Sequence, residues 1–171
     1  MKDTRKLVAL SILLSIILLL TFTPLGYPQI GPISATLMHI PVAIGVLYLK
    51  DWKSALILGL IFGITSFTKN ILQPSALSFI FLNPLVSIVP RILVGLVSYL
   101  VYKSLVGKVK PSVQGLIVGF MTAFTNTLLV LGAIGVLYAE EIGKGFFALL
   151  SGLLFTNVIP EAVIGAIVAS S

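Results

Sequence analysis

Long apolar stretches separated by short polar segments dominate this chain, and they restrict its fold more than any other feature. A helix needs about 20 mostly apolar residues to cross a bilayer core about 30 Å thick. Of the 171 residues, 9% are charged, whereas soluble domains have roughly a quarter charged residues. The sequence therefore excludes an ordinary soluble enzyme, a disordered segment and a nucleic-acid-binding protein. It predicts an integral membrane protein embedded in a lipid bilayer.

The sequence predicts an all-α fold in which residues 1–171 form a single transmembrane domain. Six helices are expected, at residues 7–22, 34–49 (interrupted by Pro41), 55–67, 85–102, 113–138 and 146–169. Residues 23–33 are expected to form an uncharged loop, because its prolines and glycines favour turns over helix interiors. Lys69 and Asn70 indicate a second loop. The apolar residues 77–82 then suit either a short helix over a cavity or the tilted start of the helix at 85–102.

The distribution of lysine and arginine predicts how the chain is oriented in the membrane. With six crossings, one side of the bilayer receives eight of these residues: Lys2, Arg5, Lys6, Lys50, Lys53, Lys103, Lys108 and Lys110. The opposite side receives Lys69 and Lys144. Cytoplasmic loops carry the excess of positive residues in multi-pass membrane proteins. We therefore expect both termini in the cytoplasm and the loop at 23–33 outside the cell membrane.

Two charged residues interrupt the apolar segments, and each directly follows a proline. They are Arg91, in Val89-Pro90-Arg91, and Glu161, in Ile159-Pro160-Glu161. A charge at the centre of a spanning helix is costly, so it usually faces a cavity or a partner. A proline inside a helix also frees a backbone carbonyl one turn earlier. The pair therefore predicts either a shared pocket for a ligand or an Arg91–Glu161 salt bridge between two helices.

Three uncharged polar residues are further candidates for such a pocket. Asn126, in Thr125-Asn126-Thr127, and Asn157, in Thr156-Asn157-Val158, lie inside expected helices, where an amide side chain can bind a polar ligand or join two helices. Asn157 and Glu161 are four residues apart and so share a helix face. His39 is the only histidine, and the chain has no cysteine. We expect His39 to donate or accept hydrogen bonds, and we expect no metal ion and no cofactor.

Motifs for catalysis and ATP binding are absent from the sequence. It contains no phosphate-binding G-x-x-x-x-G-K-[ST] loop, no H-E-x-x-H and no G-x-S-x-G. We therefore expect that the chain is not an enzyme and depends on partners for energy. Pairs of small residues recur at four-residue spacing: Ser11 and Ser15, Gly59 and Gly63, and Gly115 and Gly119. Such pairs let helices approach closely, within this chain or on another protein.

Several stretches of the chain resemble the substrate-binding S components of energy-coupling factor (ECF) vitamin importers. They are residues 36–42 (TLMHIPV), 59–66 (GLIFGITS), 89–95 (VPRILVG), 125–127 (TNT) and 156–161 (TNVIPE). The length, the six helices and the basic start before the first helix are similar as well. The stretches look like the branch that includes pantothenate and pyridoxine or hydroxymethylpyrimidine S components.

The resemblance implies a six-helix S-component bundle and a role as the binding subunit of an importer. Such a subunit binds its vitamin from outside under a lid formed by the loop after the first helix. It then docks on a transmembrane coupling protein that rests on two ATPase subunits. An Ala-xxx-Ala face on the first helix makes this contact in the family, and Ser11 and Ser15 stand at the matching positions. The expected ligand residues are Arg91, for an anion such as the carboxylate of pantothenate, with His39, Asn126, Asn157 and Glu161 as hydrogen-bonding partners.

Three alternatives remain compatible with the residues. A self-sufficient small channel or secondary transporter would use an Arg91–Glu161 pair as a gate or proton relay. An intramembrane enzyme and a membrane scaffold, whose polar residues serve only folding, are the others. The residues do not select one vitamin, since Arg91 favours an acidic ligand and Glu161 suits an amine or a hydroxyl.

Overall fold

The chain folds into a bundle of helices in a computed structural model that describes residues 2–26, 29–30, 33–34, 36–74, 78–142 and 159–170. The elements in chain order are α1 (Lys2–Phe22), η1 (Pro24–Gly26), β1 (Gln29–Ile30), β2 (Ile33–Ser34), α2 (His39–Leu49), α3 (Trp52–Leu72), α4 (Ser78–Phe81), α5 (Pro84–Ser87), α6 (Val89–Leu105), α7 (Pro111–Ile142) and α9 (Ile159–Ser170). Among the described residues, four segments are long and apolar enough to cross a membrane: Thr4–Phe22, Trp52–Leu72, Pro84–Leu105 and Pro111–Tyr138. The helical membrane bundle predicted from the sequence is confirmed, with one short hairpin, β1–β2, added to it.

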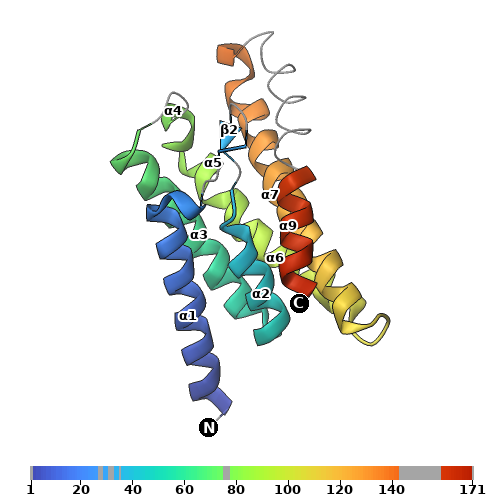
Figure 1. The fold of residues 1–171 in the computed structure, drawn as a ribbon. Coiled ribbons are helices and arrows are strands. Elements are labelled where there is room, and N and C mark those ends of the chain that lie inside the picture. Colours follow the sequence, from blue (N-terminus) through green and yellow to red (C-terminus); the bar gives the residue numbers. More distant parts are fainter. Residues whose placement is uncertain are drawn as a thin grey trace.

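Helix α2 lies at the centre of the bundle, between α1 and α3 on one side and α7 and α9 on the other (Figure 1). Its side chains Val42, Ala43 and Val46 are completely buried, and Met38 just before it is buried as well. A helix that is apolar around its whole circumference is typical of such a central position. Helix α1, in contrast, lies at the edge of the bundle, and many of its apolar side chains are exposed.

Two segments differ from the sequence prediction. The helix expected at residues 34–49 begins only at His39, and residues 33–34 instead form β2, which pairs antiparallel with β1. Pro41 consequently occupies the first turn of α2, where no intrahelical hydrogen bond is lost, and it does not interrupt the helix. Lys69 and Asn70, expected in a loop, are part of α3. The Nδ2 of Asn70 donates to the carbonyl of Ser66 within this last turn, which satisfies the polar side chain inside the helix.

The residues between α3 and α6 form two short helices rather than one tilted helix. Of the two possibilities for residues 77–82, the structure shows the short helix, α4, from Ser78 to Phe81. The helix expected at 85–102 is divided into α5 and α6 at Ile88. Ile80, Val86, Val130 and Ile134 pack together and fix these short helices against α7. Of the last helix, expected at residues 146–169, residues 146–158 lie outside the described part of the chain.

Glycines allow two pairs of helices to pack at backbone contact. A Cβ atom on Gly119 would lie 2.3 Å from the carbonyl oxygen of Gly165 in α9, and one on Gly95 would lie 2.3 Å from the carbonyl oxygen of Ala55 in α3. Gly59 and Gly63 of α3 face the backbone of Arg91 and Ile88 in the same way. The prediction that these glycines serve close helix packing is confirmed for Gly59, Gly63 and Gly119.

We expect Gly119→Ala to lower the free energy of unfolding by roughly 1–3 kcal/mol, because the new methyl group forces α7 and α9 apart. Gly132→Ala is the matched control in the same helix, since a Cβ atom there meets nothing within 4 Å. The control is expected to be neutral or to stabilise by up to about 1 kcal/mol through helix propensity. The free energy of unfolding of each variant is measured in mild detergent by titration with a denaturing detergent. Equal stability of the two variants would contradict the close contact of α7 with α9.

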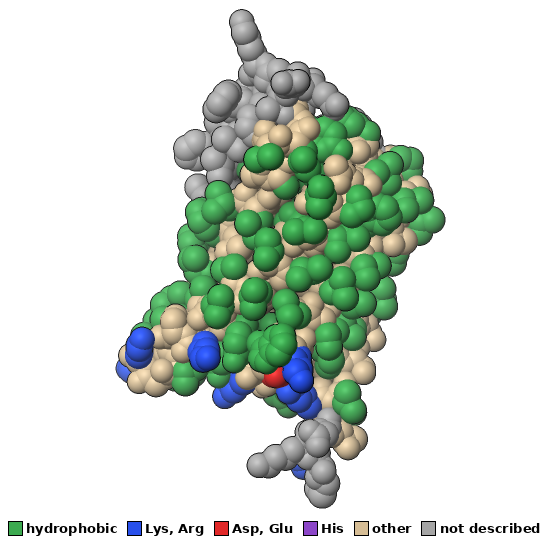
Figure 2. Space-filling model, turned by 180° about the vertical axis from the view of Figure 1, so that it is seen from behind, with side chains coloured by type: hydrophobic (Ala, Val, Ile, Leu, Met, Phe, Trp, Pro, Cys, Tyr) green, Lys and Arg blue, Asp and Glu red, His purple; other side chains and the backbone are tan. Residues whose placement is uncertain are grey.

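Positive side chains gather at one end of the bundle, here called the basic end (Figure 2). It comprises the start of α1, the α2–α3 turn and the α6–α7 turn, and its described cations are Arg5, Lys6, Lys50, Lys53, Lys103, Lys108 and Lys110. The opposite end, here called the hairpin end, contains η1, the β1–β2 hairpin and α4 (Figure 1). Both termini lie toward the basic end. The grouping of cations assumed by the sequence analysis is therefore present in the fold.

An ion pair joins α1 to the α2–α3 turn at the basic end. The Nζ of Lys6 lies 2.9 Å from Oδ2 of Asp51. The same oxygen caps α3 by accepting hydrogen bonds from the backbone N–H and the hydroxyl of Ser54, at 3.1 and 2.9 Å. Burial raises the pKa of the Asp51 carboxyl. The hydrogen bonds and the charge of Lys6 outweigh that effect, so the pKa falls below its ordinary value of 3.8.

This lowered pKa predicts a loss of stability in acid. A carboxyl with a lower pKa in the folded chain stabilises the fold above the unfolded value of 3.8, and the contribution disappears as the pH falls through the folded pKa. Because the pair is partly exposed, its contribution is at most about 1 kcal/mol. The unmodified chain is expected to have a lower free energy of unfolding at pH 3 than at pH 6. We expect this difference to be smaller in Asp51→Asn. The same difference in both chains would contradict this role for Asp51.

Candidate functional site

The break between α5 and α6 creates an unusual acceptor inside the bundle. Pro90, in the first turn of α6, has no N–H and so leaves the carbonyl of Val86, four residues earlier, without its helical donor. The Nη1 of Arg91 donates a hydrogen bond to this carbonyl. The freed carbonyl expected from the proline is therefore present, and it orients the neighbouring arginine.

Arg91 lies deep inside the bundle, with only 5% of its surface exposed. The Cζ atom of its guanidinium is 5.6 Å from the ring centre of Phe62 in α3 and 5.7 Å from that of Phe81 in α4. Gly59 allows α3 to approach the Arg91 backbone, since any Cβ there would lie 2.5 Å from the Arg91 carbonyl oxygen. The helix break and the packing thus place the guanidinium of Arg91 inside the bundle.

Asn126 lies near the middle of α7 and is also buried, with 5% of its surface exposed. Its Oδ1 accepts no hydrogen bond from any residue in the described part of the chain. A buried polar atom without a partner costs about 1–3 kcal/mol, so such atoms usually serve a purpose. The Oδ1 of Asn126 can accept a hydrogen bond from a bound molecule that carries a hydroxyl or N–H group.

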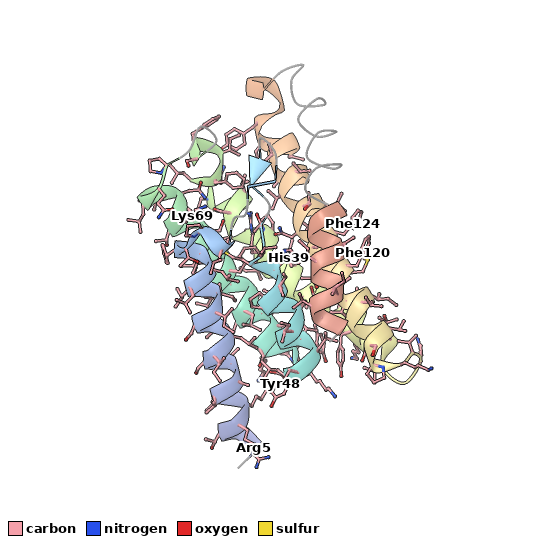
Figure 3. All side chains as sticks on the ribbon, in the orientation of Figure 1. Arg5, His39, Tyr48, Lys69, Phe120 and Phe124 are labelled. Atoms are coloured by element: carbon pink, nitrogen blue, oxygen red, sulfur yellow. The ribbon has the colours of Figure 1, made fainter. Side chains whose placement is uncertain are left out.

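His39 begins α2 and is completely buried (Figure 3). Its Nε2 lies against α9, at a point where a Cβ on Gly165 would be 3.0 Å away. A larger residue at Gly165 would therefore displace the imidazole. The absence of a side chain at this position allows α2, α7 and α9 to meet around His39.

Two contacts between helices relate the depths of these polar residues in the bundle. Ser98 of α6 and Thr122 of α7 share a hydrogen bond of 2.8 Å, and Gly119 touches Gly165. With a rise of about 1.5 Å per residue, Asn126 lies about 6 Å closer to the hairpin end than Thr122. Arg91 lies about 10 Å closer than Ser98 by the same reckoning. Arg91 and Asn126 are therefore within about one helical turn of each other in depth, and His39 lies deeper.

Two of the predicted ligand residues cannot be placed against the others. Asn157 lies outside the described residues. Glu161 belongs to α9, four residues before Gly165, but its side chain lies outside the described part. The Arg91–Glu161 salt bridge therefore stays a prediction. Among the predicted ligand residues, the structure shows that Arg91, Asn126 and His39 are all buried in the bundle interior.

Ser11 and Ser15 lie on the exposed side of α1, away from the interior residues. They line a shallow groove of about 530 Å³ together with Thr4, Leu7, Val8, Ile12, Ile16 and Leu19. The hydroxyl of Ser15 donates to the carbonyl of Ser11 at 2.9 Å, so this polar group needs no outside partner. Ser11 and Ser15 therefore give α1, at the edge of the bundle, a surface of small side chains on which another helix can pack closely.

Sequence reasoning did not identify the two aromatic residues beside Arg91. Phe62 lies three residues after Gly59 and therefore on the same face of α3, which was the only local signal. Phe81 belongs to the short helix α4, whose position against α6 depends on the fold of the whole segment. The hydrogen-bonded pair Ser98–Thr122 was likewise missed, because single hydroxyl residues are common in apolar helices.

Comparisons with known proteins identify the family of this chain. A family model described as "ECF transporter, substrate-specific component" matches residues 5–171, almost the whole chain. The "Pantothenic acid transporter PanT" of Lactococcus lactis subsp. cremoris (strain MG1363) is 29% identical over an alignment of 154 residues, and the match covers 82% of this chain and 76% of that protein. Together with the apolar helices, the match shows a multi-pass membrane protein. The chain belongs to the family of substrate-specific components of ECF transporters.

Proposed function

We propose that this chain binds pantothenate at the cell membrane and delivers it to an ECF module for import. The observation that carries the proposal is the buried guanidinium of Arg91, which provides a positive charge for a carboxylate inside the bundle. A charge-assisted, two-pronged contact between guanidinium and carboxylate is among the strongest hydrogen-bonded pairs. The similarity to a protein named as a pantothenic acid transporter supports the same ligand.

The chemistry of pantothenate matches the other buried polar residues. Besides its carboxylate, the molecule has two hydroxyl groups and an amide N–H, all of which can donate hydrogen bonds. The Oδ1 of Asn126 is a buried acceptor within about one helical turn of Arg91 in depth. We assign His39, Asn157 and Glu161 to further hydrogen bonds with the hydroxyl and amide groups. Pyridoxine and hydroxymethylpyrimidine lack a carboxylate and would leave Arg91 without its anion.

The orientation follows from the basic end of the bundle. Positive residues are enriched on the cytoplasmic side of membrane proteins. We therefore place the basic end and both termini in the cytoplasm, and the hairpin end outside. In this orientation Arg91 and Asn126 lie below η1 and the β1–β2 hairpin, and we assign these two elements to the cover of the site.

Import itself requires partners in this proposal. The groove along α1 receives the transmembrane coupling protein, and Ser11 and Ser15 allow its helices to approach closely. Two ATPase subunits bound to the coupling protein supply energy, since the chain carries no phosphate-binding loop. This assembly is the one that the ECF family implies.

Reconstitution into liposomes tests the proposal against a self-sufficient transporter. We expect radiolabelled pantothenate to accumulate only when the chain is combined with a coupling protein and two ATPase subunits. ATP must be supplied on the side of the membrane where the ATPase subunits lie. Liposomes that contain the partners without this chain are the control. Uptake by the chain alone would instead support a channel or secondary transporter.

A further inference from the structure

Two aromatic side chains, Phe62 and Phe81, lie beside Arg91 and are not among the ligand residues of the proposed function. The Cζ of Arg91 lies 5.6 Å from the ring centre of Phe62 and 5.7 Å from that of Phe81. Both distances are within the roughly 6 Å at which a cation is attracted to an aromatic face. We propose that Phe81, supported by Phe62, is a positioning residue that fixes the guanidinium for the ligand's carboxylate. This inference rests on the proposed function.

The geometry of a guanidinium makes such an arrangement useful for binding. Its five N–H donors point outward in the plane of the group, whereas an aromatic ring attracts the group through its face. The rings therefore stabilise the charge without using the donors that a carboxylate needs. The carbonyl of Val86 accepts from Nη1 and fixes the rotation of the plane. Rings and carbonyl together hold the side chain in one orientation before a ligand arrives.

Phe81 is the better of the two residues for a test. Phe62 is completely buried in the cluster with Leu13, Ile17, Met38, Val42 and Leu58, so its replacement would disturb the core. Phe81 is only partly buried, and α4 offers a matched control two residues away. Phe79 is 54% exposed and packs edge-on against Tyr138, with ring centres 6.2 Å apart.

The experiment compares two ligands that differ at one group. Pantothenol has the structure of pantothenate with a hydroxymethyl group in place of the carboxylate, so it lacks the anion that Arg91 would bind. Calorimetric titration of the purified full chain in detergent gives the Kd for each ligand. For Phe81→Leu we expect the Kd for pantothenate to rise roughly ten- to thirtyfold, because the variant loses a desolvated cation–π contact. The Kd for pantothenol is expected to change much less.

Control variants separate positioning from folding. Phe79→Leu is expected to leave both affinities unchanged, and Phe81→Tyr, which keeps the aromatic face, is expected to restore pantothenate binding. An equal loss for both ligands, no loss at all, or no rescue by Phe81→Tyr would overturn the positioning role. An unmodified chain that fails to bind pantothenate would overturn the proposed function as well. That failure appears in the first titration, before any variant is compared.

Discussion

Replacing Arg91 with alanine is expected to weaken pantothenate binding by roughly 30-fold to several thousandfold. Removing one partner of a buried charge pair costs about 2–5 kcal/mol, and each 1.4 kcal/mol is about tenfold in Kd. The guanidinium of Arg91 donates to the carbonyl of Val86 and lies over the rings of Phe62 and Phe81, so its removal takes a buried, positioned charge from the proposed site. Titration of the purified variant with pantothenate measures the loss.

Two controls keep this result interpretable. Lys53→Ala removes an exposed cation at the basic end, far from the interior, and is expected to leave the Kd unchanged. Arg91→Lys keeps a charge but offers no planar pair of donors, so an intermediate loss is expected. Each variant must remain monodisperse in detergent with a helical circular dichroism spectrum. Full affinity in a folded Arg91→Ala chain would exclude Arg91 from the site.

The second large effect is expected at the surface of α1. Replacing both Ser11 and Ser15 with leucine should reduce ATP-dependent uptake at least about tenfold and leave ligand binding unchanged. The two larger side chains fill the groove and prevent the close approach that small residues permit. A loss of more than about 1.4 kcal/mol of docking energy corresponds to such a change. Uptake into liposomes and titration of the same preparation provide the two measurements.

A leucine elsewhere on the lipid-facing surface is the matched control. Gly132 of α7 is exposed and has open space beside it, and α2 lies between α7 and α1 in the bundle (Figure 1). We expect Gly132→Leu to support normal uptake because it adds apolar volume outside the proposed docking groove. Normal uptake by the Ser11/Ser15 variant would show that the coupling protein contacts another surface.

The sequence predicts the bundle well because hydrophobic length is a direct physical requirement of the bilayer. The spans at α1, α3 and α7 appear close to their expected positions for this reason. The start of α2 was predicted wrongly: Ser34, expected in the helix, belongs to β2 and pairs with Gln29 of β1. That choice depends on a tertiary contact between neighbouring strands, and apolar periodicity does not reveal it.

The sequence identified candidate residues of the site but not the contacts between them. A charge after a proline in an apolar helix identified Arg91, and the freed carbonyl of Val86 follows from the chemistry of Pro90. The rings of Phe62 and Phe81 reach Arg91 only because α3 and α4 fold back on α6, which no local pattern in the sequence encodes. The roles of Asn157 and Glu161 stay predictions from their sequence context.

Thermal unfolding of the purified chain with a panel of water-soluble vitamins tests the central claim most directly. A ligand that binds only the folded state stabilises it by about 2.7 kcal/mol at 100 times its Kd. The account predicts a clear rise in the unfolding temperature with pantothenate and none with pyridoxine or hydroxymethylpyrimidine. A rise with one of these uncharged ligands, and none with pantothenate, would contradict the assignment of Arg91 to a ligand carboxylate.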